Sequence, residues 1–290
     1  MNHLFCFGLG YCGQALGQIL KHQGWKVSGT TRDAAALKQL EQDGFSMYQF
    51  DGDNPLPADV LDGVSHILLS IPPDDAGDPV FLKYATDLAE RANNLKWLGY
   101  LSTTGVYGDQ QGEWVDEASP LTPSTKRGEK RLKAEKDWLS LYHNHNLPVH
   151  LFRLAGIYGP GSNQLEKVAA GTAKRRIKPG QVFSRIHLDD IVGILIASMK
   201  NPSPGRAYNV CDDEAVPPQD VVTFAARLLD VEPPQEIVFN PEDMTAMGLS
   251  FFAESKRVSN QRVKDELGYV FKYPTYREGL KALLPTVKRC

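Results

Sequence analysis

The glycine-rich sequence GLGYCG at residues 8–13 constrains the fold of this chain more than any other feature. An apolar run, 3–7, precedes it and a helical pattern, 12–22, follows it. In such a strand–turn–helix unit the glycines allow a tight turn and close approach of a ligand, and the first N–H groups of the helix face an anion. The alternative is a glycine-rich turn without a ligand. We predict a pyrophosphate site formed by Gly8, Gly10, Tyr11, Cys12 and Gly13.

Short β-rich runs alternate with helical patterns along the first half of the chain. This alternation predicts an α/β fold, a doubly wound parallel sheet with helices on both faces. Strands are expected at 3–7, 26–30, 46–50, 66–71, 97–102 and 149–154, and helices at 12–22, 33–42, 79–94 and 124–145, with Asp33 and Asp78 as N-caps. Beyond residue 159, Pro and Gly separate shorter elements. We expect an NAD(P)-binding Rossmann domain over 1–158, and the chain should return to its sheet around 186–212. A smaller C-terminal substrate lobe is expected from 159–185 and 213–290.

The end of the second strand predicts which dinucleotide binds. An acidic residue about 20 positions beyond the glycines usually bonds the ribose in an NAD site. Here the strand ends in Thr30, Thr31 and Arg32. An Arg offers a planar fork of donors to phosphate oxygens, which suits the 2′-phosphate of NADP. The alternative is a solvated Arg32 paired with Asp33, and NAD is the alternative cofactor.

Composition excludes several classes of protein. The chain has 290 residues, of which 42% are hydrophobic and 23% charged, as in a globular protein. A net charge of −3 predicts neither nucleic-acid nor membrane binding. Apolar runs such as 191–199 are too short to span a bilayer and no signal segment opens the chain, so we expect a cytoplasmic protein. The four cysteines lack metal-ligand spacing, which predicts reduced thiols and no metal.

Four further motifs follow the glycine loop in order, namely STTGVYG at 102–108, RLAGIYGPG at 153–161, RIHLDD at 185–190 and YNVCD at 208–212. With them the chain resembles the extended short-chain dehydrogenase/reductase family, the NAD-dependent epimerases, dehydratases and reductases. The resemblance implies a nicotinamide cofactor and a small-molecule substrate. It also implies a homodimer packed through the helices at 79–94 and 124–145.

The resemblance implies roles for individual residues of this chain. Thr103 matches the hydroxyl that polarises the substrate oxygen. Further cofactor contacts are expected from Asp53, Ser70, Ile71, Pro72 and Ser102, and substrate contacts from Thr104, Arg127, Tyr158 and Arg176. Asp53 has an exposed loop residue as its alternative. Arg176 belongs to the basic stretch 174–178, which either meets an anionic ligand or is a solvated surface segment.

The family's proton relay, a Tyr followed four residues later by Lys, is missing. Arg127 and Arg131 stand at those positions, and none of the 11 tyrosines has Lys at the fourth following residue. Arg cannot act as a general base, although it can bind an anion. This departure resembles atypical members of the family. Tyr107, Tyr158 or His187 are candidates for proton transfer. The alternative for the two tyrosines is a packing role, and the alternative for His187 is a side-chain hydrogen bond that anchors its strand.

Two functions remain open on these residues. The first is an oxidoreductase, epimerase or dehydratase that acts on a small polar carbonyl substrate, sugar-like or anionic, with catalytic roles for Thr103 and Tyr107. The second is a catalytically silent NADP-binding redox sensor or regulatory module. The retained Thr103 segment favours the enzyme, and the missing relay favours the sensor.

Overall fold

The computed structural model describes residues 1–52 and 55–287. The chain forms two compact units. The first unit comprises Met1–Thr103, Glu129–Arg153 and Val192–Tyr208, and the second comprises Thr104–Gly128, Leu154–Ile191 and Asn209–Cys290. The predicted domain boundary at residue 158 stays a prediction.

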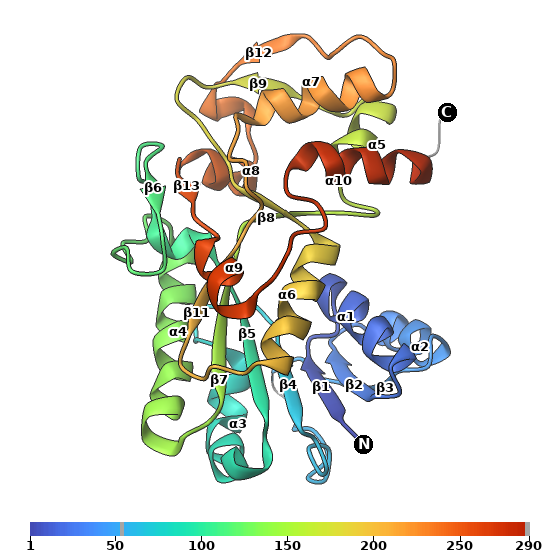
Figure 1. The fold of residues 1–290 in the computed structure, drawn as a ribbon, viewed down its shortest axis with the longest axis vertical. Helices are drawn as coiled ribbons and strands as arrows, with labels where there is room; N and C mark the ends of the chain where they lie inside the picture. The colour runs from blue at the N-terminus through green and yellow to red at the C-terminus, as the bar shows by residue number, and fades with distance from the viewer. Residues whose placement is uncertain (53–54, 288–290) are drawn as a thin grey trace. The chain divides into compact units, whose positions relative to one another are not determined.

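A seven-stranded sheet lies mainly in the first unit (Figure 1). Its strands are β1 (His3–Phe7), β2 (Lys26–Thr31), β3 (Ser46–Gln49), β4 (His66–Leu69), β5 (Trp97–Thr103), β7 (Val149–Leu154) and β11 (Ala207–Val210). Their order is β11-β7-β5-β4-β1-β2-β3, and the pairs β1–β2, β1–β4, β2–β3 and β4–β5 are parallel. Chain order therefore increases away from the β1–β4 pair in both directions, through β2 and β3 on one side and through β5, β7 and β11 on the other, as in a doubly wound sheet. This confirms the predicted α/β Rossmann fold.

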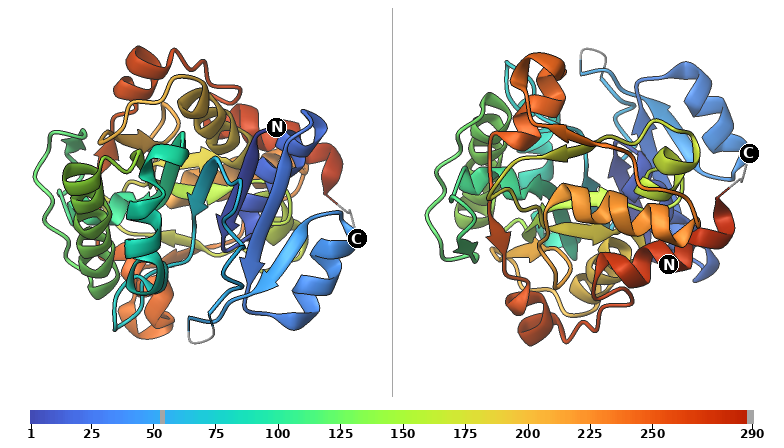
Figure 2. Two further views of the ribbon diagram at one scale, coloured as in Figure 1. Left: turned by 90° about the horizontal axis from the view of Figure 1, so that it is seen from below. Right: turned by 90° about the horizontal axis from the view of Figure 1, so that it is seen from above.

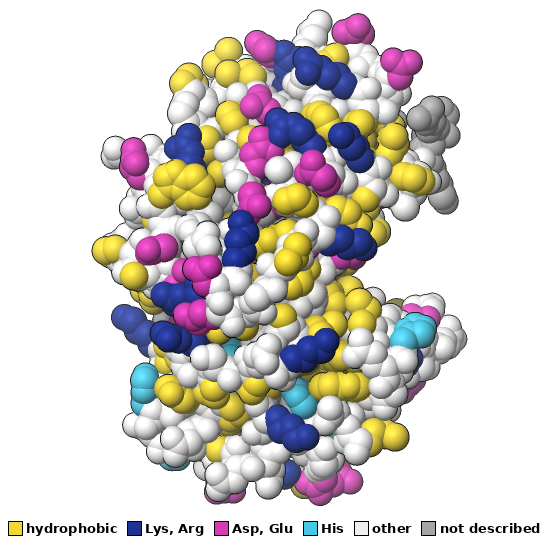
Figure 3. Space-filling model, viewed as in Figure 1, with side chains coloured by type: hydrophobic (Ala, Val, Ile, Leu, Met, Phe, Trp, Pro, Cys, Tyr) yellow, Lys and Arg dark blue, Asp and Glu magenta, His cyan; other side chains and the backbone are white. Residues whose placement is uncertain are grey.

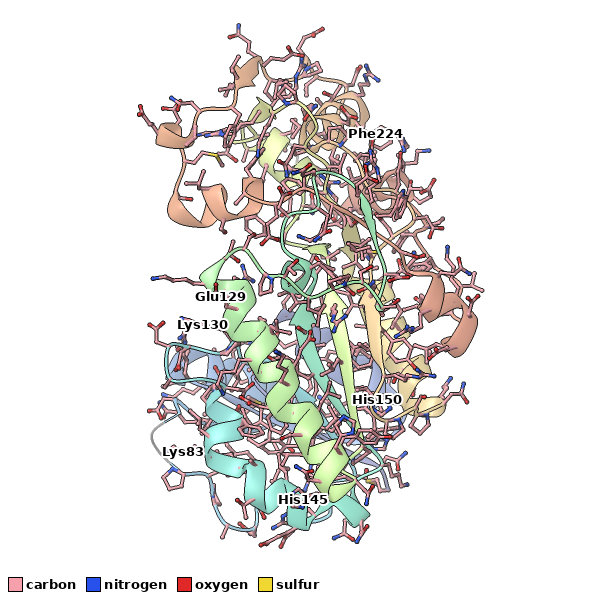
Figure 4. The ribbon with its side chains drawn as sticks, turned by 90° about the vertical axis from the view of Figure 1, so that its left-hand side faces the viewer. Lys83, Glu129, Lys130, His145, His150 and Phe224 are labelled. Atoms are coloured by element: carbon pink, nitrogen blue, oxygen red, sulfur yellow. The ribbon has the colours of Figure 1, made fainter. Side chains whose placement is uncertain are left out.

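Helices cover both faces of the sheet. They are α1 (Tyr11–His22), α2 (Ala34–Gln42), α3 (Pro79–Glu90), α4 (Lys126–His145) and α6 (Leu188–Lys200), with the 3-10 turn η1 (Ala92–Asn94) after α3. Figures 2 and 4 show α3 and α4 side by side on one face, where the indole Nε1 of Trp138 donates to Asp78 Oδ2 at 3.2 Å. On the other face the indole of Trp97 donates to the Ser198 hydroxyl of α6 at 3.0 Å.

Burial on both faces explains why the strands are almost continuously apolar. All five residues of β1 are buried. Phe5 and Phe7 belong to the core cluster that also contains Trp138 of α4. Because side chains alternate along a strand, Leu4 and Cys6 fill the opposite face. The sheet is therefore the buried centre that holds the ends of its strands in place.

The predicted helix caps are confirmed. Asp33 Oδ1 accepts from the Ala35 N–H at 2.8 Å, and Asp78 Oδ1 accepts from the Val80 N–H at 2.9 Å. The predicted strand at 66–71 ends earlier, at Leu69. The neighbouring strand β1 ends at Phe7, which pairs with Leu69, so the ladder ends there.

The second unit contains shorter elements around a core of its own. The strands are β6 (Trp114–Val115), β8 (Gly156–Tyr158), β9 (Arg175–Ile177), β10 (Arg185–His187), β12 (Glu236–Val238) and β13 (Arg257–Val258). The helices are α5 (Gln164–Ala169), α7 (Pro218–Leu228), α8 (Ala246–Phe252), α9 (Gln261–Leu267) and α10 (Tyr276–Leu283), with the 3-10 turns η2 (Thr104–Tyr107), η3 (Pro241–Asp243) and η4 (Leu284–Thr286). Tyr158, Leu165, Val221 and Tyr276 are among its core residues. Strand pairs β8–β10, β9–β12 and β6–β13 form three small parallel sheets.

The molecular surface carries charges of both signs. On the face shown in Figure 3, acidic and basic side chains are interspersed. Among the described residues, no helix is both long and apolar enough to cross a membrane. Within the same residues, no group of three His, Cys, Asp or Glu side chains is placed to hold a metal ion.

Candidate functional site

The glycine loop follows β1 at the carboxyl edge of the sheet, and neighbouring strands hold its first residue. Gly8 has φ +84°, a conformation that favours glycine. Its N–H donates to Thr30 Oγ1 at 2.9 Å, and its carbonyl accepts from the Ser70 hydroxyl. A Cβ on Gly8 would lie 2.8 Å from Ile71 Cγ1. Glycine is therefore required at this position by both conformation and space.

The start of α1 is open in the way that a bound phosphate requires. Gly10 is the N-cap residue, no side chain caps the helix, and the first turn has no acidic residue. A Cβ built on Gly10 meets nothing within 4 Å, whereas one on Gly13 lies 3.4 Å from Leu9 Cδ1. The start of the helix therefore has open space beside Gly10, where the positive end of the helix dipole lies. This geometry fits a dinucleotide pyrophosphate.

The other predicted residues of the loop lie on different sides of it. Tyr11 is 39% exposed, whereas Cys12 is buried. Burial raises the pKa of the Cys12 thiol to about 11, so its contribution to an anion site is its backbone N–H. Ile71 is half-buried against Gly8, and Pro72 is exposed.

Thr30 and Thr31, two predicted contacts of the 2′-phosphate at the end of β2, differ in their burial. Thr30 is fully buried and its hydroxyl accepts from the loop, which favours a role inside the fold, and its direct contact with a 2′-phosphate stays a prediction. Thr31 is half-buried and Arg32 is exposed. Among the described residues Arg32 has no ion-pair partner, and the Asp33 carboxylate caps α2 instead. The contact of Thr31 and Arg32 with a phosphate stays a prediction. Asp53, one of the predicted cofactor contacts, lies outside the described residues.

The end of β5 holds a buried charge network. The Ser102 hydroxyl donates to Glu135 Oε1 of α4 at 2.5 Å. Arg153 Nη2 of β7 donates to Glu135 Oε2 at 2.8 Å, and its Nε donates to Oε1 at 3.1 Å. The Ser102 hydroxyl is therefore bonded inside the unit, and its contact with the cofactor stays a prediction. Thr103, the next residue, is half-buried at the end of the strand.

The two arginines that replace the family's relay have different surroundings. Arg131 is buried and donates to Leu101 O at 2.6 Å and to the Tyr100 hydroxyl at 3.1 Å. Arg127, in the first turn of α4, is exposed. Figure 4 shows the helix with Glu129 and Lys130 near one end and His145 near the other. Arg131 thus anchors the helix to β5, and the predicted anion contact of Arg127 stays a prediction.

Sequence reasoning missed the structural role of Glu135. A signal was present, because Glu135 follows Arg131 by four residues and therefore lies on the same face of the helix. Both side chains reach consecutive residues of β5, Leu101 and Ser102. Local spacing could not identify these partners on another element.

In the second unit, Tyr107 and Tyr158 have packing roles. Tyr107 is fully buried and its hydroxyl donates to Asn209 Oδ1 at 2.7 Å. Tyr158 is buried beside the His187 ring, with centroids 5.2 Å apart. A Cβ on Gly279 would lie 2.2 Å from the Tyr158 hydroxyl, so α10 packs directly on it. The geometry favours the packing alternative for both tyrosines, and their functional roles stay predictions.

Two of the remaining candidates of this unit, His187 and Arg176, also have internal bonds. His187 Nδ1 accepts from the Asp189 N–H at 3.0 Å, and burial lowers the pKa of His187 to about 4. Arg176 Nη2 donates to Asp243 O at 3.1 Å, and its neighbour Arg175 pairs with Glu236. Thr104 is half-buried in η2. These contacts favour the surface interpretation of the basic stretch, in which the arginines join β9 to adjacent segments.

A parallel doubly wound sheet with an open glycine loop at its carboxyl edge defines a Rossmann-type dinucleotide-binding protein. Residues 79–211 match the family model described as "NAD dependent epimerase/dehydratase family". The chain is 30% identical to Protein YeeZ of Escherichia coli (strain K12) over 287 residues, which is 94% of this chain and 97% of that protein. The chain belongs to the NAD-dependent epimerase/dehydratase family, as its motifs predicted.

Solved structures agree with this assignment. A functionally unknown conserved protein from Silicibacter pomeroyi DSS has a TM-score of 0.90 and 48% identity, with 99% of each chain covered. A UDP-glucuronic acid 4-epimerase from Bacillus cereus in complex with NAD has a TM-score of 0.75 and 17% identity, with 98% of each chain covered. The second likeness is one of fold.

Proposed function

We propose that the protein is an NADP(H)-dependent enzyme of the atypical extended short-chain dehydrogenase/reductase type. Its substrate would be a small polar carbonyl compound, sugar-like or anionic, which it reduces, oxidises, epimerises or dehydrates. The observation that carries the proposal is the uncapped start of α1, with free space beside Gly10. The exposed Arg32 supports NADP over NAD.

In this proposal the residues of the first unit hold the cofactor. The first-turn N–H groups of α1 bind the pyrophosphate, and Arg32 with Thr31 binds the 2′-phosphate. The nicotinamide supplies or accepts a hydride when it is bound. The Thr103 hydroxyl donates to the substrate oxygen and stabilises the charge that develops there. Because Asn209 already accepts from the Tyr107 hydroxyl, water is the better-supported proton source.

Cofactor titration and a substrate screen test the proposal. NADPH fluorescence should change on binding to the wild-type protein and should not change with Gly10→Val, whose side chain fills the pyrophosphate space. Pools of carbonyl compounds should then deplete bound NADPH. A wild-type protein that binds neither NADPH nor NADH would overturn the proposal. Binding of NADPH without turnover of any compound would support cofactor binding and contradict the proposed enzymatic activity.

A redox sensor is the second candidate, favoured by one observation. Arg131, at the position of the relay lysine, is buried and bonded to β5, so α4 offers no such relay. A sensor should show different hydrogen-exchange patterns with NADP⁺ and NADPH and should turn over no substrate. Identical patterns with both forms would exclude it.

We propose further that the protein acts in the cytoplasm as a homodimer, packed through 79–94 and 124–145. The buried free thiols of Cys6, Cys12 and Cys211 suit a reducing compartment. Leu82 on α3 is 59% exposed and offers an apolar contact for a second copy. Light scattering after size exclusion should give twice the chain mass, and Leu82→Lys should shift it toward the monomer. A monomeric wild type would remove the dimer.

A further inference from the structure

Two hydroxyl groups hold the peptide of Gly8 from neighbouring strands. Thr30 Oγ1, at the end of β2, accepts from the Gly8 N–H at 2.9 Å. The Ser70 hydroxyl, just beyond β4, donates to the Gly8 carbonyl and, at 3.3 Å, to the Phe7 carbonyl. Both polar groups of Gly8 are therefore satisfied by side chains from outside the loop.

The same carbonyl sets the N-cap of α1. Gly8 O also accepts from the Gly10 N–H at 2.8 Å, and the Leu9 N–H donates to Thr30 O at 2.7 Å. The position of Gly10, beside the free space, thus depends on the orientation of the Gly8 peptide. With φ at +84°, this peptide needs fixed partners to keep one orientation.

We infer that Thr30 and Ser70 are positioning residues for cofactor affinity. They touch no ligand themselves, and they orient the loop so that the first-turn N–H groups of α1 converge on the pyrophosphate. The inference rests on the proposed function. It assigns Thr30 and Ser70 to the loop, in place of direct contacts with the cofactor.

The test compares Thr30→Val, which keeps the shape and removes the acceptor, with Thr30→Ser, which keeps the acceptor. The Kd for NADPH should rise about 3- to 10-fold in Thr30→Val, the range expected for one lost hydrogen bond, and return near the wild-type value in Thr30→Ser. Ser70→Ala should raise the Kd by a similar factor. Fluorescence titration gives the Kd values.

Ser28→Ala is the matched control. Ser28 lies on the same strand, is buried, and its hydroxyl pairs with His3 Nε2 at 2.6 Å, away from the loop. Its loss should lower the melting temperature as Thr30→Val does and leave the NADPH affinity unchanged. A second readout uses adenosine 2′-monophosphate, which lacks the pyrophosphate and should bind wild type and Thr30→Val equally.

The outcomes distinguish a failure of the proposed function from a failure of the positioning role of Thr30 and Ser70. Wild-type protein that binds neither NADPH nor NADH refutes the proposed function. Normal wild-type binding with unchanged Kd in both Thr30→Val and Ser70→Ala overturns the positioning role alone. An equal affinity loss in Ser28→Ala also overturns it, because the effect would then be general destabilisation. If Thr30→Val fails to fold, Ser70→Ala decides between these outcomes.

Discussion

Breaking the buried pair between Glu135 and Arg153 should destabilise the first unit more than any surface change. The pair's side chains are 1% and 5% exposed, and Nη2 of Arg153 lies 2.8 Å from Oε2. Glu135→Gln removes the carboxylate charge that faces the buried guanidinium. Removing one partner of a buried pair costs about 3 to 5 kcal/mol, so we expect a loss of about 3 kcal/mol because Gln still accepts one bond.

Urea unfolding followed by tryptophan fluorescence measures this loss. Trp97 and Trp138 are fully buried in the first unit and report its unfolding. Glu129→Gln, an exposed acid-to-amide change on the same helix, should cost less than about 1 kcal/mol.

Replacing both partners isolates the pair itself. Glu135→Leu with Arg153→Met removes both charges and should recover most of the stability, with a residual loss of about 1 kcal/mol from the unpaired Ser102 hydroxyl. A loss below about 1 kcal/mol in Glu135→Gln would refute the reasoning. So would a double variant less stable than Glu135→Gln, because the cost would then come from packing and not from an unpaired charge.

Four further predictions follow from the site and from one buried histidine. Arg32→Ala should reduce the preference for NADPH over NADH by about 10- to 150-fold in parallel titrations, and an unchanged ratio would place the 2′-phosphate elsewhere. Gly10→Val should abolish NADPH binding at an unchanged melting temperature, because a Cβ there meets nothing within 4 Å; tight binding by the folded variant would contradict the loop assignment. Thr103→Ala should lower turnover about 100- to 1000-fold with little change in NADPH affinity, and unaltered turnover would place the chemistry elsewhere. Arg127→Ala should chiefly raise KM for an anionic substrate. Burial lowers the pKa of His150 to about 4, and its Nε2 accepts from the Ser203 N–H. Between pH 6.5 and 4 the unfolded chain therefore binds the extra proton, and the wild type should lose about 2 kcal/mol of unfolding free energy between pH 7 and pH 5 that His150→Gln should not lose. Parallel urea curves at the two pH values measure this difference, and equal losses in the two proteins would contradict it.

The sequence by itself determined the elements of the first unit and their class. Strand and helix periods are local, and the caps at Asp33 and Asp78 act on N–H groups two and three residues away. The order of strands, loops and motifs was therefore sufficient to predict a doubly wound sheet with a glycine loop at its carboxyl edge. The short elements of the second unit lack such periods, and their packing around Tyr158 and Tyr276 could not be derived in the same way.

Only the tertiary structure decided which partner each hydroxyl of a neighbouring pair meets. Consecutive residues of a strand point to opposite faces of the sheet, so Thr30 and Thr31 meet different neighbours, as do Ser102 and Thr103. The sequence named both members of each pair as site residues. Thr30 meets Gly8 across 22 residues and Ser102 meets Glu135 across 33, contacts that exist only once the strands and α4 have packed. Thr31 and Thr103 are half-buried, whereas Thr30 and Ser102 are buried, and the Thr31 hydroxyl accepts from the Asp33 N–H only two residues away.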